Sequence, residues 1–330
     1  MGPGFQRRQA LLALGVGGAC ALHSVLSFGA ESAWPSRPIR IIVVYPVGGI
    51  SDGITRALAQ KLSQRLGVAV VVENRAGMGG GIGMGLLSKA AADGYTLAFS
   101  AISPLSLGPH VLPTSYDPFK DIAPVVSVMQ TPILLVGTSA FKGERFQDLL
   151  SLGHAGKSLR WATSGRATTG YLVMDSVRRT SKIDIVHIPY KGGGQQLVDA
   201  LTGQFDLLST NMGETQLQYI RQGKLKALAV GASARLQQLP DVPTFAELGF
   251  AQANLASIFG IFAPAKTPAP ILARLNAVLN EILELPEMRA LLLSVDNLPT
   301  GGSAAEFLHQ ITHEWEINRS LVQMERLKHD

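Results

Sequence analysis

Two junctions rich in glycine and hydroxyl groups are the segments of this sequence best suited to hold a small anion. The first is 45–52 (YPVGGISD), and the second is 163–171 (TSGRATTGY). Each follows an apolar run and precedes helical spacing, so each is expected at a strand-to-helix turn. Free backbone N–H groups and the partial positive charge of a helix N-terminus favour anions there. The pattern predicts a carboxylate site, and two ordinary capped turns are the alternative.

Other motifs that could carry chemistry are weaker. The glycine-rich stretch 77–85 (GMGGGIGMG) fits neither the dinucleotide-binding register nor a Walker A loop, which favours a flexible turn at a cleft rim. The sequence contains no G-x-S-x-G elbow and no H-E-x-x-H motif. His309 and His313 stand four residues apart, where they could share a metal or simply face solvent. His187 lies in the apolar run IVHIPY and is expected to be a buried, hydrogen-bonded histidine.

Composition narrows the class of protein. The 330 residues are 46% hydrophobic and 16% charged, which suits a globular protein of about two domains and excludes wholesale disorder. A single cysteine excludes a disulfide framework and a cysteine-based metal cluster. The formal net charge of +5 is spread without long basic runs, so no nucleic-acid partner is expected.

The first 33 residues have the pattern of a signal peptide. Arg7 and Arg8 precede an apolar stretch, 10–22, that is too short to span a bilayer comfortably. The arginine pair leaves both the twin-arginine and the Sec export routes open. Gly17 stands three residues before Cys20, where a lipoprotein signal carries an apolar residue, so no lipid anchor is expected. The mature chain is expected to be a soluble periplasmic protein.

Alternating strands and helices predict an α/β fold with parallel sheets. In the first part we expect buried strands at 39–45 and 68–72, a third strand at 95–100, and helices at 51–66 and 82–92, with Ser51 or Asp52 as the cap of the first helix. A second series is expected to have strands at 159–163, 183–188, 205–208 and 225–230, with helices at 146–152, 169–178, 195–201 and 215–221. After a strand at 258–262, only helices are expected, at 269–283, 287–293 and 304–327.

The run 124–136 decides how the two series connect. Pro132 interrupts it, so it is either two strands or one strand that crosses between lobes. We expect one lobe to comprise 34–135 and 258–330 and the other 136–257, with a cleft between them. Ligands of parallel α/β sheets bind at the carboxyl ends of strands, where both junctions would lie.

Several segments, taken together, resemble a known family. The segments YPVGGISD, VVVENRAGMGGGIG, ADGYTLAFS, VHIPYKGGG, LPDVPTFAELG and FGIFAPAKTPAPILARLN occur in the order typical of the Bug receptors, the periplasmic solute-binding proteins of tripartite tricarboxylate transporters. The similarity extends from about residue 34 to the C-terminus. It implies a type II periplasmic-binding-protein fold with two α/β lobes and a hinged cleft. It also implies a receptor that binds small carboxylates, acidic amino acids or aromatic acids for a membrane permease, without enzymatic activity or a cofactor.

The resemblance also implies which residues hold the ligand. The first junction matches the family pattern at Pro46, Gly48, Gly49 and Asp52. The second departs from it, with Arg166, Ala167 and Tyr171 where Asn, Gly and His are common. Ser209-Thr210-Asn211 replaces a common Phe-Asp-Asn, which favours a plain carboxylate over an amino acid. The expected ligand-binding residues are Pro46, Val47, Gly48, Gly49, Ser51, Asp52, Ser103, Ser164, Gly165, Arg166, Thr168, Thr169, Tyr171, Lys191 and Asn211.

The functional expectation is therefore a monomeric receptor that delivers a small organic carboxylate to the permease subunits of a tripartite transporter, with no metal. Three alternatives remain at this point. The protein could be a sensor subunit that presents the ligand to a signalling partner. It could be a periplasmic hydrolase or isomerase that acts on a carboxylate. It could be a structural protein of the cell envelope.

Overall fold

The computed structural model describes residues 34–325, so the expected signal peptide at 1–33 lies outside the described residues. The first part contains β1 (Ile39–Val43), α1 (Ile50–Leu66), β2 (Val70–Asn74), η1 (Met78–Gly80), α2 (Gly81–Ser88), β3 (Thr96–Ala101), α3 (Ser103–Ser106) and α4 (Gly108–Val111). The middle part contains β4 (Ile122–Gly137), α5 (Phe146–His154), β5 (Leu159–Thr163), α6 (Thr169–Ser181), β6 (Ile185–Pro189), α7 (Gly193–Leu201), β7 (Leu207–Asn211), α8 (Glu214–Arg221) and β8 (Lys226–Gly231). The last part contains η2 (Ala251–Ala253), β9 (Ala256–Pro264), α9 (Ala269–Leu283), α10 (Pro286–Leu293), β10 (Leu298–Gly301) and α11 (Ala304–Glu325).

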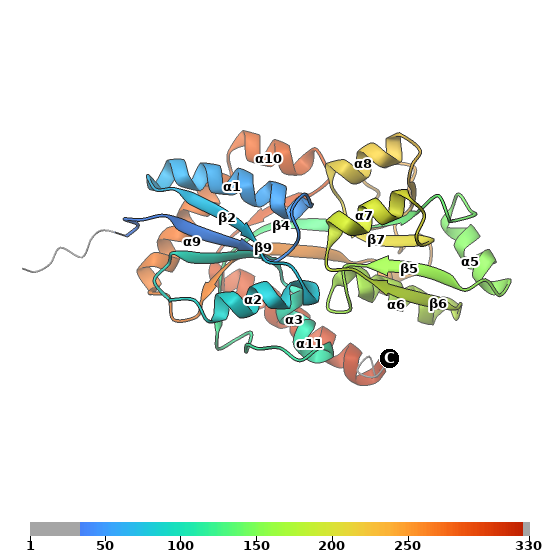
Figure 1. Cartoon of the computed structure of the whole chain (residues 1–330), viewed down its shortest axis with the longest axis horizontal. Helices are drawn as coiled ribbons and strands as arrows, with labels where there is room; N and C mark the ends of the chain where they lie inside the picture. The colour runs from blue at the N-terminus through green and yellow to red at the C-terminus, as the bar shows by residue number, and fades with distance from the viewer. Residues whose placement is uncertain (1–33, 326–330) are drawn as a thin grey trace, which may run out of the picture. The chain divides into compact units, whose positions relative to one another are not determined.

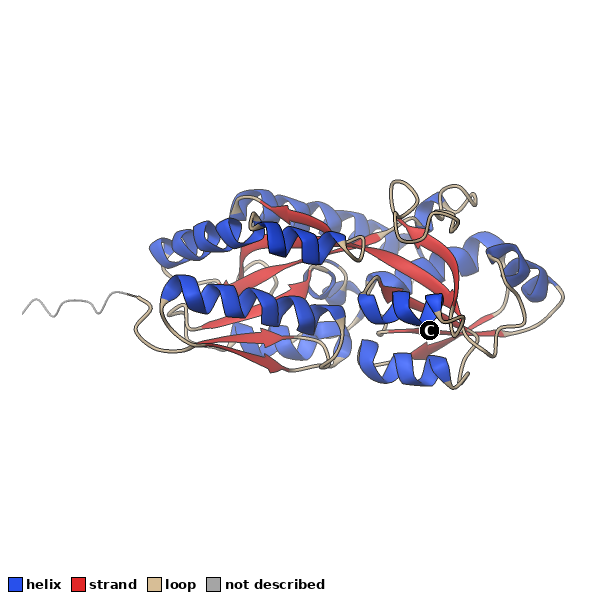
Figure 2. Ribbon diagram, turned by 90° about the horizontal axis from the view of Figure 1, so that it is seen from above, coloured by secondary structure: helices blue, strands red, loops and turns tan. Residues whose placement is uncertain are grey.

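These elements form one mixed sheet with helices on both faces (Figures 1 and 2). The strand order is β2-β1-β3-β9-β4-β7-β5-β6, and β8 and β10 also pair with β4. The β1–β2, β1–β3, β5–β6 and β5–β7 pairs are parallel, whereas β9 runs antiparallel to β3 and β4. The parallel groups place the first junction after β1 and the second after β5, each at a carboxyl end.

Strand β4 joins the two halves of this sheet. Up to Pro132 it pairs with β9, and from Ile133 onward it pairs with β7 and β8. The Pro132 carbonyl accepts a hydrogen bond from Met212 N at 3.1 Å. The chain around Pro132 is thus one strand that crosses between halves, and the proline lies where the strand changes partners. In the first half (Figure 1), α1 and α10 cover one face, and α2, α3 and α11 the other.

Helix α1 follows the first junction, and its buried face and its two ends fix where the junction stops. Ile54, Leu58 and Leu62 are buried on one face, as their spacing predicts. The helix ends at Gly67, whose φ of 71° is left-handed. The N-cap is Gly49 rather than the expected Ser51 or Asp52, because the helix begins one residue earlier, at Ile50.

Two sequence expectations about strands are wrong. Strand β2 is the end strand of the sheet and not a fully buried one, since its outer edge is unpaired and Val71 is 54% exposed. The last part of the chain does not contain helices only: β10 pairs antiparallel with β4 through Leu298 and Gln130. Its four residues include a proline and a glycine, so the segment carries almost no strand pattern.

The terminal helices pack on the first half of the sheet. Helix α9 lies against α1 and β4, and α11 lies against α3 and β4. Phe307 of α11 contacts Phe262 of β9 with ring centroids 5.2 Å apart. Exposed ion pairs, including Arg65 with Glu281, add little beyond this packing.

Candidate functional site

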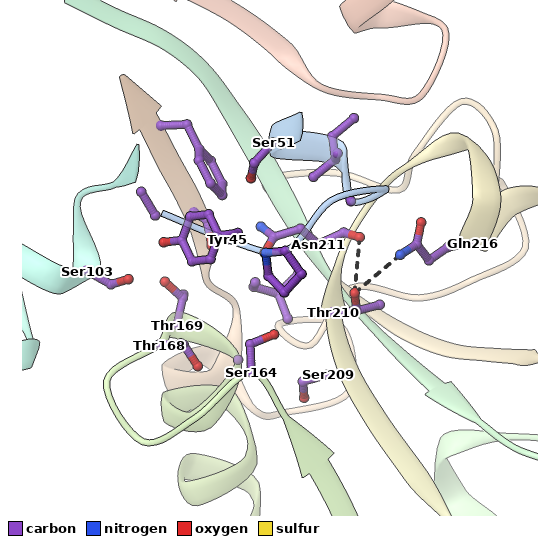
Figure 3. Close-up of a pocket in the computed structure, with 18 residues that line it drawn as sticks. Tyr45, Ser51, Ser103, Ser164, Thr168, Thr169, Ser209, Thr210, Asn211 and Gln216 are labelled. Carbon is purple, nitrogen blue, oxygen red and sulfur yellow. Dashed lines mark hydrogen bonds between the residues drawn. The ribbon is translucent and has the colours of Figure 1, made fainter. Parts of the chain in front are cut away.

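The two junctions meet at a small cavity of about 60 Å³ between the halves of the sheet (Figure 3). Its lining comes from the first junction, the end of β3, the second junction, β7 and the start of β9. The lining residues are Tyr45, Pro46, Gly49, Ile50, Ser51, Ala101, Ser103, Ile133, Ser164, Thr168, Thr169, Gly170, Ser209, Thr210, Asn211, Gln216, Ser257 and Phe259. The cavity is much smaller than the 300–1,000 Å³ typical of sites for drug-sized ligands.

The lining is polar but carries no charged side chain. Positive potential comes instead from two helix N-termini, because Ile50 and Ser51 open α1 and Thr169 and Gly170 open α6. The first N–H groups of a helix have no partner inside the helix, and the macrodipole adds a partial positive charge. An anion in the cavity would therefore be held by neutral donors.

Asn211 supplies the clearest unmet donor. Its Nδ2 atom is shielded from solvent and has no hydrogen-bond partner among the described residues. Neighbouring polar groups are occupied with each other: Gln216 Nε2 donates to Thr210 Oγ1 at 3.4 Å (Figure 3). A buried donor without a partner costs about 1–3 kcal/mol, so the geometry favours a ligand that brings an acceptor.

Tyr45 adds an uncharged hydroxyl to the opposite wall. Burial raises the pKa of Tyr45 to about 12, against the lowering effect of neighbouring Ser100 and Ser103. The ring lies edge-on to Phe259, with centroids 6.0 Å apart. The phenol therefore stays protonated at neutral pH and can donate a hydrogen bond.

Hydroxyl groups of the second junction mostly stabilise the loop itself. Thr168 Oγ1 donates to the Gly165 carbonyl at 2.6 Å, and Ser164 Oγ donates to Gln196 Oε1 at 3.1 Å. Thr168 and Ser164 therefore reach the cavity mainly as acceptors. The Thr169 hydroxyl makes no such hydrogen bond among the described residues, so it is the better donor to a ligand.

His187 also stabilises the second junction, through a hydrogen bond to Thr163. Thr163 Oγ1 accepts from Gly165 N at 3.1 Å and is hydrogen-bonded to His187 Nε2 at 2.8 Å. Burial, with a smaller contribution from Arg166, lowers the pKa of His187 to about 4. His187 is thus a neutral, hydrogen-bonded histidine, as its apolar surroundings in the sequence predict.

Asp52 shapes the first junction without lining the cavity. Its carboxylate accepts from Gly48 N at 3.1 Å and pairs with Arg56 at 2.9 Å. Although burial raises it, the bonds from Arg56 and Gly48 hold the pKa of Asp52 below its usual range. Gly48 has a φ of 82°, a left-handed conformation that glycine adopts without strain. Asp52 fixes this turn and so positions Gly49.

The structure brings eight of the fifteen expected ligand-binding residues into the lining. These are Pro46, Gly49, Ser51, Ser103, Ser164, Thr168, Thr169 and Asn211. The other seven lie outside it, namely Val47, Gly48, Asp52, Gly165, Arg166, Tyr171 and Lys191.

The side chains outside the lining have other surroundings. Val47 is 64% exposed, and Lys191 is also exposed. Tyr171 is buried, and its ring lies edge-on to His187 with centroids 4.9 Å apart. Arg166 is half-buried beside His187. The fixed positive charge expected at this site therefore does not reach the cavity.

Sequence reasoning missed ten residues of the lining: Tyr45, Ile50, Ala101, Ile133, Gly170, Ser209, Thr210, Gln216, Ser257 and Phe259. Tyr45 and Ile50 stand inside the first junction, Gly170 stands inside the second, and Ser209 and Thr210 adjoin Asn211. Proximity in the sequence was therefore an available signal for those five. Phe259 and Ser257 have no such signal, because only the antiparallel pairing of β9 with β3 and β4 brings them to the cavity.

Glycines allow the two halves to touch around the cavity. A Cβ added at Gly192 would overlap the ring of Pro46. Gly79 of the glycine-rich stretch faces Ala167, and an added Cβ there would lie 3.1 Å from the Ala167 Cβ. Only the start of the stretch 77–85 is a turn, formed by η1, because residues 81–85 already belong to α2 and not to the expected flexible turn.

The described part of the chain holds neither a membrane-spanning helix nor a cluster of metal-ligating side chains. None of the helices between residues 34 and 325 combines the length and apolar character needed to cross a membrane. Within that range, no three or more His, Cys, Asp or Glu side chains gather where they could hold a metal. The exposed rings of His309 and His313 stack 6.5 Å apart on α11.

The mixed sheet with two halves and a cavity between them is the two-lobed fold of periplasmic binding proteins. Solved structures agree with this class. A protein from R. palustris solved with adipate is similar with a TM-score of 0.83 and 28% identity, covering 88% of this chain and 97% of that one. MatC from Rhodopseudomonas palustris with bound malate has a TM-score of 0.82 and 27% identity, covering 87% and 99%.

The sequence pattern of the tripartite tricarboxylate transporter family receptor matches residues 54–327. BugT of Bordetella pertussis is 37% identical over 254 residues, which is 76% of this chain and 78% of BugT. The chain belongs to the tripartite tricarboxylate transporter receptor family, and the resemblance to Bug receptors is confirmed. The family is one of periplasmic solute-binding receptors.

Proposed function

We propose that this protein is a periplasmic receptor that binds a small organic carboxylate and delivers it to the permease of a tripartite transporter. The observation that carries the proposal is Asn211 Nδ2, a buried donor that has no partner in the described part of the chain and lies at a cavity with no charged lining residue. A carboxylate oxygen is the acceptor this donor lacks. The N-termini of α1 and α6 stabilise the charge that the ligand brings.

The similar proteins solved with adipate and malate support this ligand class. Binding without chemical conversion fits the same geometry, because Tyr45, with a pKa of about 12, is a hydrogen-bond donor and not a base at neutral pH. We further propose that residues 1–33 are a signal peptide, that the mature chain is a soluble monomer, and that 34–135 with 258–330 and 136–257 are the two lobes. Pro46 and Ser103 line the cavity from one half and Thr169 from the other, which suits closure of these lobes over the ligand.

Thermal unfolding of the mature protein against a panel of mono-, di- and tricarboxylates and amino acids tests the proposal. A ligand at 100 times its Kd adds about 2.7 kcal/mol to the free energy of unfolding. At roughly 2–4 °C per kcal/mol, the Tm should rise by several degrees. Mass spectrometry of the denatured protein serves as the control for a co-purified ligand. A protein free of ligand that shows no shift with any carboxylate would contradict the proposal.

A further inference from the structure

A second cavity, of about 330 Å³, lies beside the first. It is enclosed by α6, α11, the α3 region and the segment that leads into β9. Its walls are largely aliphatic, with Leu107, Leu172, Leu255, Ile317 and Leu321 among them. Burial of an apolar group in such a cavity contributes about 0.8 kcal/mol per CH₂.

The two cavities adjoin. Ser103 and Thr169 line both of them, one from each half of the sheet. A carboxylate head in the first cavity would therefore pass its remaining atoms between these two hydroxyls into the second. The first cavity, at about 60 Å³, offers little room for more than the head group.

Polar groups of the second cavity show what the far end of such a ligand can carry. Ser176 is 4% exposed, and its Oγ has no hydrogen-bond partner among the described residues. Glu314 is half-buried and accepts only a long bond, 3.4 Å, from Ser106 Oγ. Burial raises the pKa of Glu314 to about 7. The Glu314 carboxyl disfavours a second anion here, but it can accept a hydrogen bond from a hydroxyl group of the ligand.

Arg179 also lines this cavity, but its charge is already compensated. Its Nε lies 3.1 Å from Asp175 Oδ2, and Asp175 is fully buried. A ligand carboxylate at the far end would have to compete with this ion pair while approaching Glu314. The electrostatics of the second cavity therefore favour an uncharged tail.

Resting on the proposed function, we propose that the second cavity is a tail subsite that selects amphipathic monocarboxylates. The carboxylate is held beside Asn211, and an aliphatic or aromatic body extends past Ser103 and Thr169. This narrows the substrate class from small carboxylates in general to monocarboxylates with an extended apolar body.

Titration calorimetry with acetate, hexanoate and adipate tests the subsite. Acetate supplies the head alone, whereas hexanoate and adipate have the same number of carbons and differ in the second carboxylate. We expect hexanoate to bind on the order of 100-fold tighter than acetate, from four buried CH₂ groups, and about tenfold tighter than adipate. Acetate binding as tightly as hexanoate, or adipate binding more tightly, would overturn the subsite and leave the receptor proposal standing. Failure of all three acids to bind would overturn the subsite, whereas the receptor proposal is overturned only if no carboxylate of the wider panel shifts the Tm.

A matched pair of variants locates the effect. Ile317→Trp places a large side chain at the second cavity, and Ile317 is 46% exposed on α11, so the helix tolerates the change. Leu308→Trp is the control, because Leu308 is 42% exposed on the same helix and lines neither cavity. We expect Ile317→Trp to weaken hexanoate at least tenfold and to leave acetate unchanged, with Leu308→Trp affecting neither. Equal hexanoate affinity in both variants would overturn the assignment.

Discussion

The indole N–H of Trp161 donates a 2.7 Å hydrogen bond to Ser209 Oγ. Trp161 is fully buried in β5. Ser209 lies on the neighbouring parallel strand β7 and lines the first cavity. Because the Ser209 oxygen accepts from the indole, its own proton remains to be donated. The core of the second half thus fixes the orientation of one hydroxyl at the candidate site.

Ser209→Ala should therefore lower stability as well as ligand affinity. The variant leaves the Trp161 N–H buried without an acceptor, which costs about 1–3 kcal/mol in the free energy of unfolding. Urea denaturation measures this loss. In the double variant Trp161→Phe/Ser209→Ala the donor is gone too, so the two single losses should not add. Strict additivity would show that the bond contributes nothing.

Asn211→Ala separates binding from folding. Asn211 Nδ2 forms no hydrogen bond with any residue between 34 and 325, so its removal should leave the stability of the ligand-free protein unchanged or slightly higher. A hydrogen bond to a charged group contributes about 1.5–3 kcal/mol, so carboxylate affinity should fall about 10- to 100-fold. Calorimetric titration and thermal unfolding of the same sample measure both quantities. Asn211→Asp should bind more weakly still, because it places an anion beside the ligand. Wild-type affinity in either variant would remove Asn211 from the site.

Gly192, in the loop after β6, lies directly against Pro46 of the first junction. The methyl group of Gly192→Ala would overlap Pro46, so this loop and the first junction could not approach as closely, and ligand affinity should fall at least tenfold. Gly223→Ala is the matched control, since Gly223 has a φ of 68° and open space around an added Cβ. Both changes strain a positive φ and should cost about 1 kcal/mol of stability. Equal affinities in the two variants would show that the Gly192 contact is irrelevant to binding.

His187 should make the protein less stable in acid. Its pKa is about 4 in the folded protein, below the ordinary 6.5, so below pH 6.5 the unfolded chain binds a proton that the folded chain does not. The free energy of unfolding should therefore fall by about 2 kcal/mol more between pH 7 and pH 5 in the wild type than in His187→Gln. Urea denaturation across this range measures the difference. Parallel curves for the two proteins would contradict the assignment.

The sequence predicted the elements better than it predicted side-chain directions. Apolar periodicity located α1, β5 and α6, and therefore both junctions, because burial on one face sets those patterns. It could not place Arg166 or Tyr171, whose directions depend on the backbone of the preceding turn, where Gly165 has a φ of 115°.

Long-range pairing was the other limit. Phe259 and Ser257 reach the cavity only because β9 inserts antiparallel between β3 and β4. Strand β10 was not predicted because its sequence has no alternating apolar pattern. Only its pairing with β4 defines it as a strand. Local patterns predicted two lobes with a cleft between them, and the resemblance to a family implied the type II periplasmic-binding-protein fold in particular.

Strand β4 has a consequence for how this protein folds. Its residues up to Pro132 complete the first half of the sheet, and its residues from Ile133 complete the second. Neither half can reach its native pairing while β4 is unformed, and β9 must return from late in the chain to lie beside it. Contacts this distant in sequence slow folding. They also couple the halves, so the described chain should melt in a single cooperative calorimetric transition.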